Sequence, residues 1–230
     1  MFSINDSRTG YQEKFYLYRG KAEEGPETNS ATAYPAEVLL APTKYHHKNH
    51  ILCTDNWFTS FQQLKTCLTY GLHMVGTVQK KRKGIPFSWK PAHGIQQKRE
   101  RGEFLSLKTA YYVQEELNDE VYYTSWIDRK PVAILHTIQT KLGVCTRMVK
   151  TKNDGWQCKE YTRPTIILFY NYGMGGTDSG DQRLEAYRPE LKTNSWIPRV
   201  MSHFINSAIV NCFIWYTAAF PERNLSHYKF

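Results

Sequence analysis

The sequence has few cysteines and no spacing that would pair them. There are five, an odd number, and none forms a Cys-x-x-Cys motif. We therefore expect a reducing compartment rather than a disulfide framework. The neighbouring residues His46, His47, His50 and Cys53 do not follow a common zinc spacing either.

No apolar stretch approaches the length of a membrane span. Such a helix needs roughly 20 consecutive apolar residues, and the apolar runs here are much shorter. The first ten residues, MFSINDSRTG, also lack the organisation of a signal peptide. We therefore expect no membrane partner.

The composition that remains indicates a folded, basic protein. Hydrophobic residues make up 41% and aromatic residues 14% of the 230 residues, which is enough for a core and argues against wholesale disorder. The formal net charge is +9. Such a charge favours a polyanionic partner, because Lys and Arg contacts to phosphates supply affinity whatever the base sequence.

Apolar periodicity in the first third of the chain predicts alternating strands and helices. Residues 1–20 indicate a hairpin around the turn DSRTG, and residues 50–54 a buried strand. Residues 61–70 have helical spacing that ends at Gly71, and residues 73–78 indicate another strand. This part of the chain is therefore predicted to be α/β.

The middle of the chain has a different pattern. Alternating apolar segments between residues 103 and 140 predict several strands. The run IILFYN at residues 166–171 predicts one more strand, followed by a glycine-rich turn at residues 173–176. Helical patterns then cover residues 179–191 and 198–218.

Four aspartates stand in distinctive contexts: Asp6 in NDSRTGY, Asp55 in CTDNWFTS, and Asp178 with Asp181 in MGGTDSGDQ. Each has a structural explanation by itself, as a turn residue, a helix-cap residue or favourable charge at a helix N-terminus. DNA-cutting enzymes also use carboxylates from distant segments to hold two divalent ions. Mg²⁺ prefers such oxygen ligands. On a helix, Asp178 and Asp181 would share one face.

These contexts, in this order, resemble the three places where the piggyBac transposase family carries its catalytic aspartates. The similarity extends along nearly the whole chain through the blocks at residues 53–60, 74–78, 83–86, 126–132, 170–182 and 192–196. One departure is Gln79, where the family usually has Arg. The sequence also shows neither the family's N-terminal DNA-binding region nor its cysteine-rich domain. We therefore expect a catalytic core cut at both ends.

The resemblance implies an α/β fold in which an RNase H-like mixed sheet with flanking helices is interrupted by a mostly β insertion domain. Residues 1–81 and 164–230 would form the two parts of the core, and residues 82–163 the insertion. Periodicity alone predicts only a mixed α/β protein, in one part or two.

The resemblance also implies a reaction and its site. Asp6, Asp55 and Asp178 would bind Mg²⁺ or Mn²⁺, and Asp181 would be an auxiliary acid. The reaction would be cleavage of a phosphodiester in DNA followed by strand transfer, with transposon ends and a TTAA target as partners. We expect a nuclear location, and a homodimer for a full-length protein.

The candidate DNA contacts are Trp196 and the basic run Lys80, Lys81, Arg82 and Lys83. An indole at position 196 could stack on an unpaired base, or it could belong to the core. The basic run could bind phosphates, lie on a solvated loop, or act as a nuclear-localisation patch. The alternative function is a domesticated or remnant transposon-derived DNA-binding protein without catalytic activity.

Overall fold

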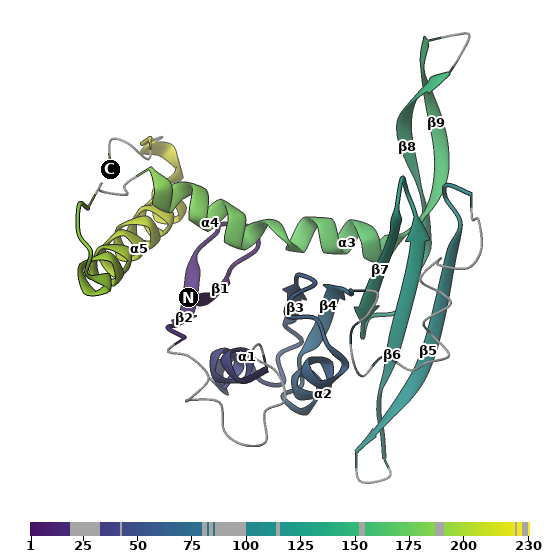
Figure 1. Cartoon of the computed structure of the whole chain (residues 1–230), viewed down its shortest axis with the longest axis horizontal. Helices are drawn as coiled ribbons and strands as arrows, with labels where there is room; N and C mark the ends of the chain where they lie inside the picture. Colours follow the sequence, from purple (N-terminus) through teal and green to yellow (C-terminus); the bar gives the residue numbers. More distant parts are fainter. Residues whose placement is uncertain are drawn as a thin grey trace. The chain divides into compact units, whose positions relative to one another are not determined.

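The computed structural model describes residues 1–18, 33–41, 43–79, 82, 85, 100–113, 116–151, 155–186, 191–223, 225–226 and 230. The chain forms two compact units. Unit 1 comprises Met1–Arg19 and Tyr172–Phe230, and unit 2 comprises Gly20–Asn171. Figure 1 labels their elements. Within the described ranges, no helix has both the length and the apolar character that crossing a membrane requires.

Unit 1 brings the first strands of the chain together with its last helices. The predicted hairpin is confirmed as β1 (Phe2–Asn5) paired antiparallel with β2 (Gln12–Tyr16). The helices are α4 (Gly175–Glu185) and α5 (Trp196–Ala219), followed by the short 3₁₀ helix η4 (Pro221–Arg223).

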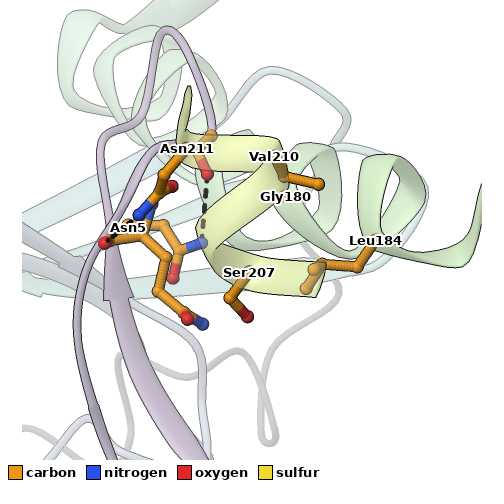
Figure 2. A pocket seen from close by; sticks show the side chains of 8 residues that line it. Asn5, Gly180, Leu184, Ser207, Val210 and Asn211 are labelled. Carbon is orange, nitrogen blue, oxygen red and sulfur yellow. Dashed lines mark hydrogen bonds between the residues drawn. The ribbon is translucent and has the colours of Figure 1, made fainter. Parts of the chain in front are cut away.

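The side chain of Asn211 joins helix α5 to β2. It hydrogen-bonds both main-chain groups of Gln12, as the backbone of a neighbouring strand would. Asn211 Oδ1 accepts a hydrogen bond from Gln12 N at 3.0 Å, and Asn211 Nδ2 donates to Gln12 O at 3.0 Å. Phe15 of β2 also stacks on Phe204 of α5, with 4.7 Å between ring centroids. Figure 2 shows Asn211 beside Asn5 at the end of β1. These contacts hold the hairpin against the helix.

Unit 2 is built on a five-stranded mixed sheet with the order β3-β4-β7-β6-β5. Its strands are β3 (Ile51–Thr54), β4 (His73–Thr77), β5 (Phe104–Val113), β6 (Glu116–Ile127) and β7 (Pro131–His136). Only β3 and β4 are parallel; the other neighbours are antiparallel. The strands β5 to β7 lie within the predicted insertion and continue the sheet of β3 and β4. The domain boundaries themselves stay a prediction.

Helices α1 (Ala33–Leu40) and α2 (Phe61–Thr69) lie beside β3 and β4 in Figure 1. Ser60 caps α2, because its side chain accepts from Gln63 N at 3.0 Å. The helix ends before Gly71, whose φ of 64° favours glycine. The predicted order of strand, helix and strand is thus confirmed, and β3 and β4 pair in parallel.

The centre of the sheet contains a buried histidine. His136 Nδ1 lies 2.7 Å from Ile138 O and donates to it, so Nε2 accepts from Thr124 Oγ1 at 2.9 Å. The ring stacks on Tyr122 of β6 with 5.4 Å between centroids. Burial lowers the pKa of His136 from 6.5 to about 4, although the hydrogen bond to Ile138 acts in the opposite direction. The imidazole is therefore neutral in the folded protein at neutral pH.

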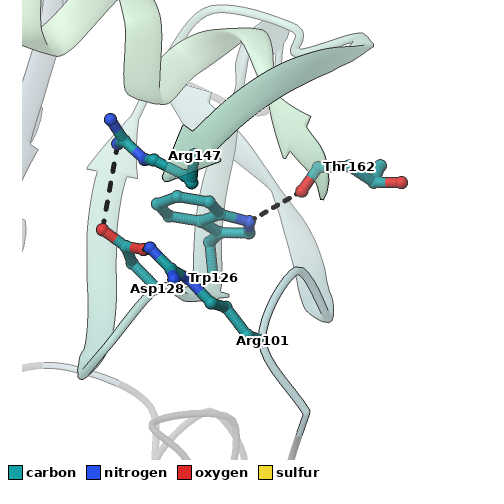
Figure 3. A network of polar contacts seen from close by, with 5 residues as sticks. All are labelled: Arg101, Trp126, Asp128, Arg147 and Thr162. Atoms are coloured by element: carbon teal, nitrogen blue, oxygen red, sulfur yellow. Dashed lines mark hydrogen bonds and ion pairs between the residues drawn. The ribbon is translucent and has the colours of Figure 1, made fainter. Parts of the chain in front are cut away.

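The strands β8 (Leu142–Thr151) and β9 (Gly155–Pro164) form a separate two-stranded ribbon that the sequence analysis did not predict. Figure 3 shows how it is tied to β6: Trp126 Nε1 donates to Thr162 O at 2.9 Å. Asp128 pairs with Arg101 at 2.5 Å and lies 3.8 Å from Arg147 of β8. One carboxylate thus links the ribbon to the sheet.

The strand predicted at residues 166–171 is wrong, because this run belongs to the helix α3 (Thr165–Gly173). Ile166, Ile167 and Tyr170 are buried, whereas Leu168 and Phe169 are exposed. Burial at i, i+1 and i+4 is a helical pattern. The five apolar and aromatic residues at positions 166–170 cannot distinguish this pattern from a buried strand.

Candidate active site

Asp6 directly follows β1 and organises the turn after it. Its Oδ1 accepts three hydrogen bonds, from Thr9 Oγ1 at 2.6 Å, Thr9 N at 2.8 Å and Arg8 N at 3.2 Å. Gly10 N also donates to Asp6 O at 2.9 Å, with Gly10 at a φ of 74°. Within the described residues Asp6 Oδ2 receives no hydrogen bond, so it remains available to a ligand from outside the turn.

The environment of Asp6 favours its charged form. Burial raises the pKa of this carboxyl, but the hydrogen bonds from Thr9 and Arg8 and the charge of Arg8 outweigh burial, so the pKa lies below its ordinary value of 3.8. The resulting contribution to stability is present above that ordinary value and is lost as pH falls through the folded value. Asp6 is therefore a carboxylate at any pH near neutrality.

Asp55 repeats this arrangement at the end of β3. Its Oδ1 accepts from Trp57 N at 3.0 Å and Phe58 N at 3.2 Å. Thr59 Oγ1 donates to the main-chain carbonyl of Asp55 at 2.6 Å. Again Oδ2 has no hydrogen bond from the described residues. Both aspartates thus use one oxygen to hold their own turn and leave the other unengaged.

The Asp55 turn rests on Gly76 of the neighbouring strand β4. Thr59 Oγ1 lies 2.8 Å from Thr54 Oγ1, and both threonines are buried. A Cβ atom at position 76 would lie 2.2 Å from each of these hydroxyl oxygens. Only glycine leaves room for the threonine pair that supports Asp55.

Replacing Gly76 by alanine is expected to lower the free energy of unfolding by about 1–3 kcal/mol, since overpacking forces the two threonines apart. Urea unfolding would measure the loss. Gly143→Ala in β8 is the matched control, because its Cβ would meet nothing nearer than 3.7 Å. Equal stability of Gly76→Ala and the unchanged chain would contradict this account of the turn.

Two further side chains contact the Asp55 turn. Arg82 Nη2 donates to the main-chain carbonyls of Asn56 and Trp57, the latter at 2.7 Å. Gln79 Nε2 donates to Asn56 Oδ1 at 3.2 Å. The predicted DNA contact Arg82 therefore has its guanidinium against this turn. Lys80, Lys81 and Lys83, predicted with it, lie outside the described residues.

Tyr170 of α3 lies near the same end of the sheet, and the sequence analysis did not single it out. Its hydroxyl is 3.1 Å from Thr77 Oγ1 at the end of β4. Burial raises the pKa of Tyr170, the hydrogen bond with Thr77 lowers it, and the charge of Asp55 adds to the rise. The negative charge of Asp55 therefore contributes to the raised pKa of Tyr170.

Helix α4 packs directly on the Asp6 turn through glycines. A Cβ atom at Gly176 would lie 2.8 Å from Asp6 O, and one at Gly180 would lie 3.0 Å from Gly10 O. The glycine-rich turn predicted at residues 173–176 is wrong for all three glycines, because Gly173 ends α3 and Gly175 and Gly176 begin α4. Gly176 and Gly180 serve close packing of the helix on the turn.

Asp178 and Asp181 lie on α4 and are exposed. At 3.6 residues per turn, Asp178 is turned roughly 160–200° away from Gly176 and Gly180. It therefore leaves the helix on the side opposite to the Asp6 turn. Among the side chains that the structure describes, no three His, Cys, Asp or Glu form a ready-made metal group. Asp55 belongs to unit 2, so a site shared by Asp6, Asp55 and Asp178 stays a prediction.

Trp196 is the first residue of α5, and 64% of it is exposed. The alternative of a core tryptophan is therefore wrong. An exposed indole at the beginning of a helix is available to a partner, which suits the predicted contact with DNA.

Comparison with known proteins places these features in a family. A family model described as Transposase IS4 matches residues 1–213. A cryo-EM structure of piggyBac transposase, in a synaptic complex with hairpin DNA, matches 98% of this chain with a TM-score of 0.69 and 24% identity.

This chain covers 42% of that piggyBac transposase. The structural match confirms the predicted mixed α/β class and shows a fold similar to that of the piggyBac transposase. The family implies a divalent metal cation, and carboxylate oxygens such as Asp6 Oδ2 and Asp55 Oδ2 suit a hard cation. On the match over residues 1–213, this chain belongs to the Transposase IS4 family.

Proposed function

We propose that this chain is the catalytic part of a piggyBac-like DNA transposase. The observation that carries the proposal is the repeated strand-end turn, in which Asp6 and Asp55 each keep Oδ2 unengaged. Decay of an active site would not be expected to preserve two such turns. The family match supports the same reading.

The residues have separate tasks in this proposal. Asp6, Asp55 and Asp178 would hold Mg²⁺ or Mn²⁺. Because Asp178 leaves α4 on the side opposite to the Asp6 turn, these two carboxylates would share a metal only after a rearrangement around α4. Asp181 would be an auxiliary acid on the same face of α4 as Asp178. Such ions activate the attacking oxygen and neutralise charge on the leaving one. The chain itself orients the carboxylates: Thr9 fixes the Asp6 turn, and Thr59 with Gly76 fixes the Asp55 turn.

The partner would be DNA, with transposon ends as substrate and TTAA as target. The net charge of +9 supports a polyanionic partner. We extend the proposal to a homodimer for a longer protein, to a nuclear location, and to the division into core (1–81, 164–230) and insertion (82–163).

Metal-dependent nicking of a labelled DNA end by the purified chain tests the proposal. We expect nicks with Mg²⁺ or Mn²⁺ and none in the presence of EDTA. The rival function, a transposon-derived DNA-binding protein, predicts retention of the same DNA without cleavage at any metal concentration. That result would overturn the proposed activity.

Trp196→Ala is expected to weaken binding to a DNA end with unpaired bases more than binding to plain duplex. Stacking on an aromatic side chain contributes roughly 1–3 kcal/mol per base in single-strand binders, and duplex offers no free base. Fluorescence anisotropy with both DNAs would measure the difference.

Trp215→Ala is the matched control, because Trp215 lies on the same helix and is 77% exposed. We expect it to change neither affinity. Equal losses in the two variants, or an equal loss for both DNAs, would contradict stacking by Trp196.

A further inference from the structure

Arg183 of α4 is hydrogen-bonded to the turn that carries Asp6. Its Nη1 donates to the main-chain oxygen of Thr9 at 2.7 Å in a partly buried contact. The same peptide group donates from Gly10 N to Asp6 O at 2.9 Å. The peptide that joins Thr9 to Gly10 is therefore held at both ends, by a guanidinium on one side and by Asp6 on the other.

Arg183 continues the stripe by which α4 contacts this turn. Gly176, Gly180 and Arg183 are spaced by four and three residues, so they lie within roughly 60° of one another around the helix. The two glycines let the helix backbone approach the turn closely. Arg183 lies about one turn of helix α4 after Gly180, and its longer side chain reaches Thr9 in the Asp6 turn.

Asn5 also contacts both the turn and α4. Its Nδ2 donates to Gly10 O at 3.3 Å, and a Cβ atom at Gly180 would lie 2.7 Å from this nitrogen. Figure 2 shows Asn5 beside Gly180. Asn5 and the α4 stripe thus both contact the Asp6 turn, and Arg183 supplies the charged hydrogen bond within this contact.

The position of the Arg183 guanidinium near Asp6, a proposed metal ligand, needs an explanation. Charge alone would make Arg183 oppose the binding of a divalent cation at Asp6. Its hydrogen bond, however, fixes Thr9, which supplies two of the three hydrogen bonds to Asp6 Oδ1. Fixing Oδ1 also fixes the direction of Oδ2.

We propose that Arg183 is a positioning residue that holds Asp6 in the orientation for binding metal. The inference rests on the proposed function, which makes Asp6 a metal ligand. Arg183 touches neither metal nor DNA in this proposal and acts only through the Thr9–Gly10 peptide.

Mn²⁺ binding to the whole chain, followed by the electron paramagnetic resonance of free Mn²⁺, tests this role without any activity assay. Arg183→Gln is expected to weaken Mn²⁺ binding roughly tenfold or more, as loss of an outer supporting contact does at metal sites. Arg183→Lys keeps the charge and one donor, so we expect a smaller loss. If Arg183 acted only through its positive charge, Arg183→Gln would bind Mn²⁺ more tightly. Weaker binding by this variant therefore indicates positioning, and tighter binding indicates electrostatic repulsion.

Arg199→Gln is the matched control. Arg199 Nη2 also donates to a threonine carbonyl, Thr193 O, at 2.7 Å, but on α5. This variant loses the same charge and the same kind of bond, and we expect no weakening of Mn²⁺ binding. Equal weakening in Arg183→Gln and Arg199→Gln would overturn the positioning role.

Unchanged or tighter Mn²⁺ binding by Arg183→Gln would also overturn it. Circular dichroism would check the fold of each variant, and Arg183→Lys decides the matter if the glutamine variant is unfolded. An unchanged chain that binds Mn²⁺ no better than Asp6→Asn would overturn the proposed function together with this inference.

Discussion

Asp55→Asn is expected to lower Mg²⁺-dependent nicking of a DNA end by several hundredfold or more. A metal ion contributes several kcal/mol of charge stabilisation in such reactions, and each 1.36 kcal/mol is a factor of ten in rate. With its oxygen kept at the Oδ1 position, asparagine offers only a neutral amide nitrogen where Asp55 presents Oδ2. The rate of nicking under saturating DNA would measure the loss.

The same substitution contains its own control for folding. An asparagine Oδ1 can still accept from Trp57 N and Phe58 N, as Asp55 Oδ1 does. We therefore expect the free energy of unfolding to change by no more than about 0.5 kcal/mol. Nicking at the original rate would exclude Asp55 from the site, whereas a large loss of stability would show that the turn depends on the charge.

Acid is expected to destabilise unit 2 through His136, by about 3 kcal/mol between pH 6.5 and pH 4. The folded pKa of His136 is about 4, against 6.5 for an ordinary histidine, and each pKa unit corresponds to 1.36 kcal/mol. In this window the unfolded chain binds a proton that the folded chain does not. Stability therefore rises with pH and is lost as pH falls below 6.5.

Urea unfolding at a series of pH values would measure this slope, and His136→Gln is the control. Glutamine keeps polar atoms near Thr124 but does not titrate, so this variant should lack the part of the slope between pH 6.5 and pH 4. Its absolute stability can differ without affecting the test. An identical slope in both proteins would show that other groups cause the acid sensitivity.

Local pattern predicted much of the fold. The hairpin of β1 and β2 and the order β3, α2, β4 follow from short apolar runs bounded by clear turn signals such as Gly71. The segment of α3 did not, because residues 166–170 are all apolar or aromatic and Asn171 alone does not reveal their period. The ribbon of β8 and β9 was missed since its strands mix charged and apolar residues on both faces.

Local sequence likewise predicted some residues of the candidate site and could not predict others. The strand-end positions of Asp6 and Asp55 could be predicted, because each ends an apolar run and precedes turn-forming residues. Thr9 and Thr59 could have been found as well, since threonine follows each aspartate within four residues. Arg183 could not, because its partner Thr9 is 174 residues away. Contacts over such distances leave no local pattern in a single sequence.

Unit 1 combines two segments that are far apart in the sequence, and this determines the order in which its parts can fold during synthesis. Gln12 and Asn211 are 199 residues apart, so a ribosome adding roughly 5–20 residues per second would separate them by roughly 10–40 s. A lone two-stranded hairpin is marginally stable in water. We therefore expect the Asp6 turn to take its final shape only after α4 and α5 have emerged. Until then, a nascent chain would carry an Asp6 turn that lacks its support from α4 and α5.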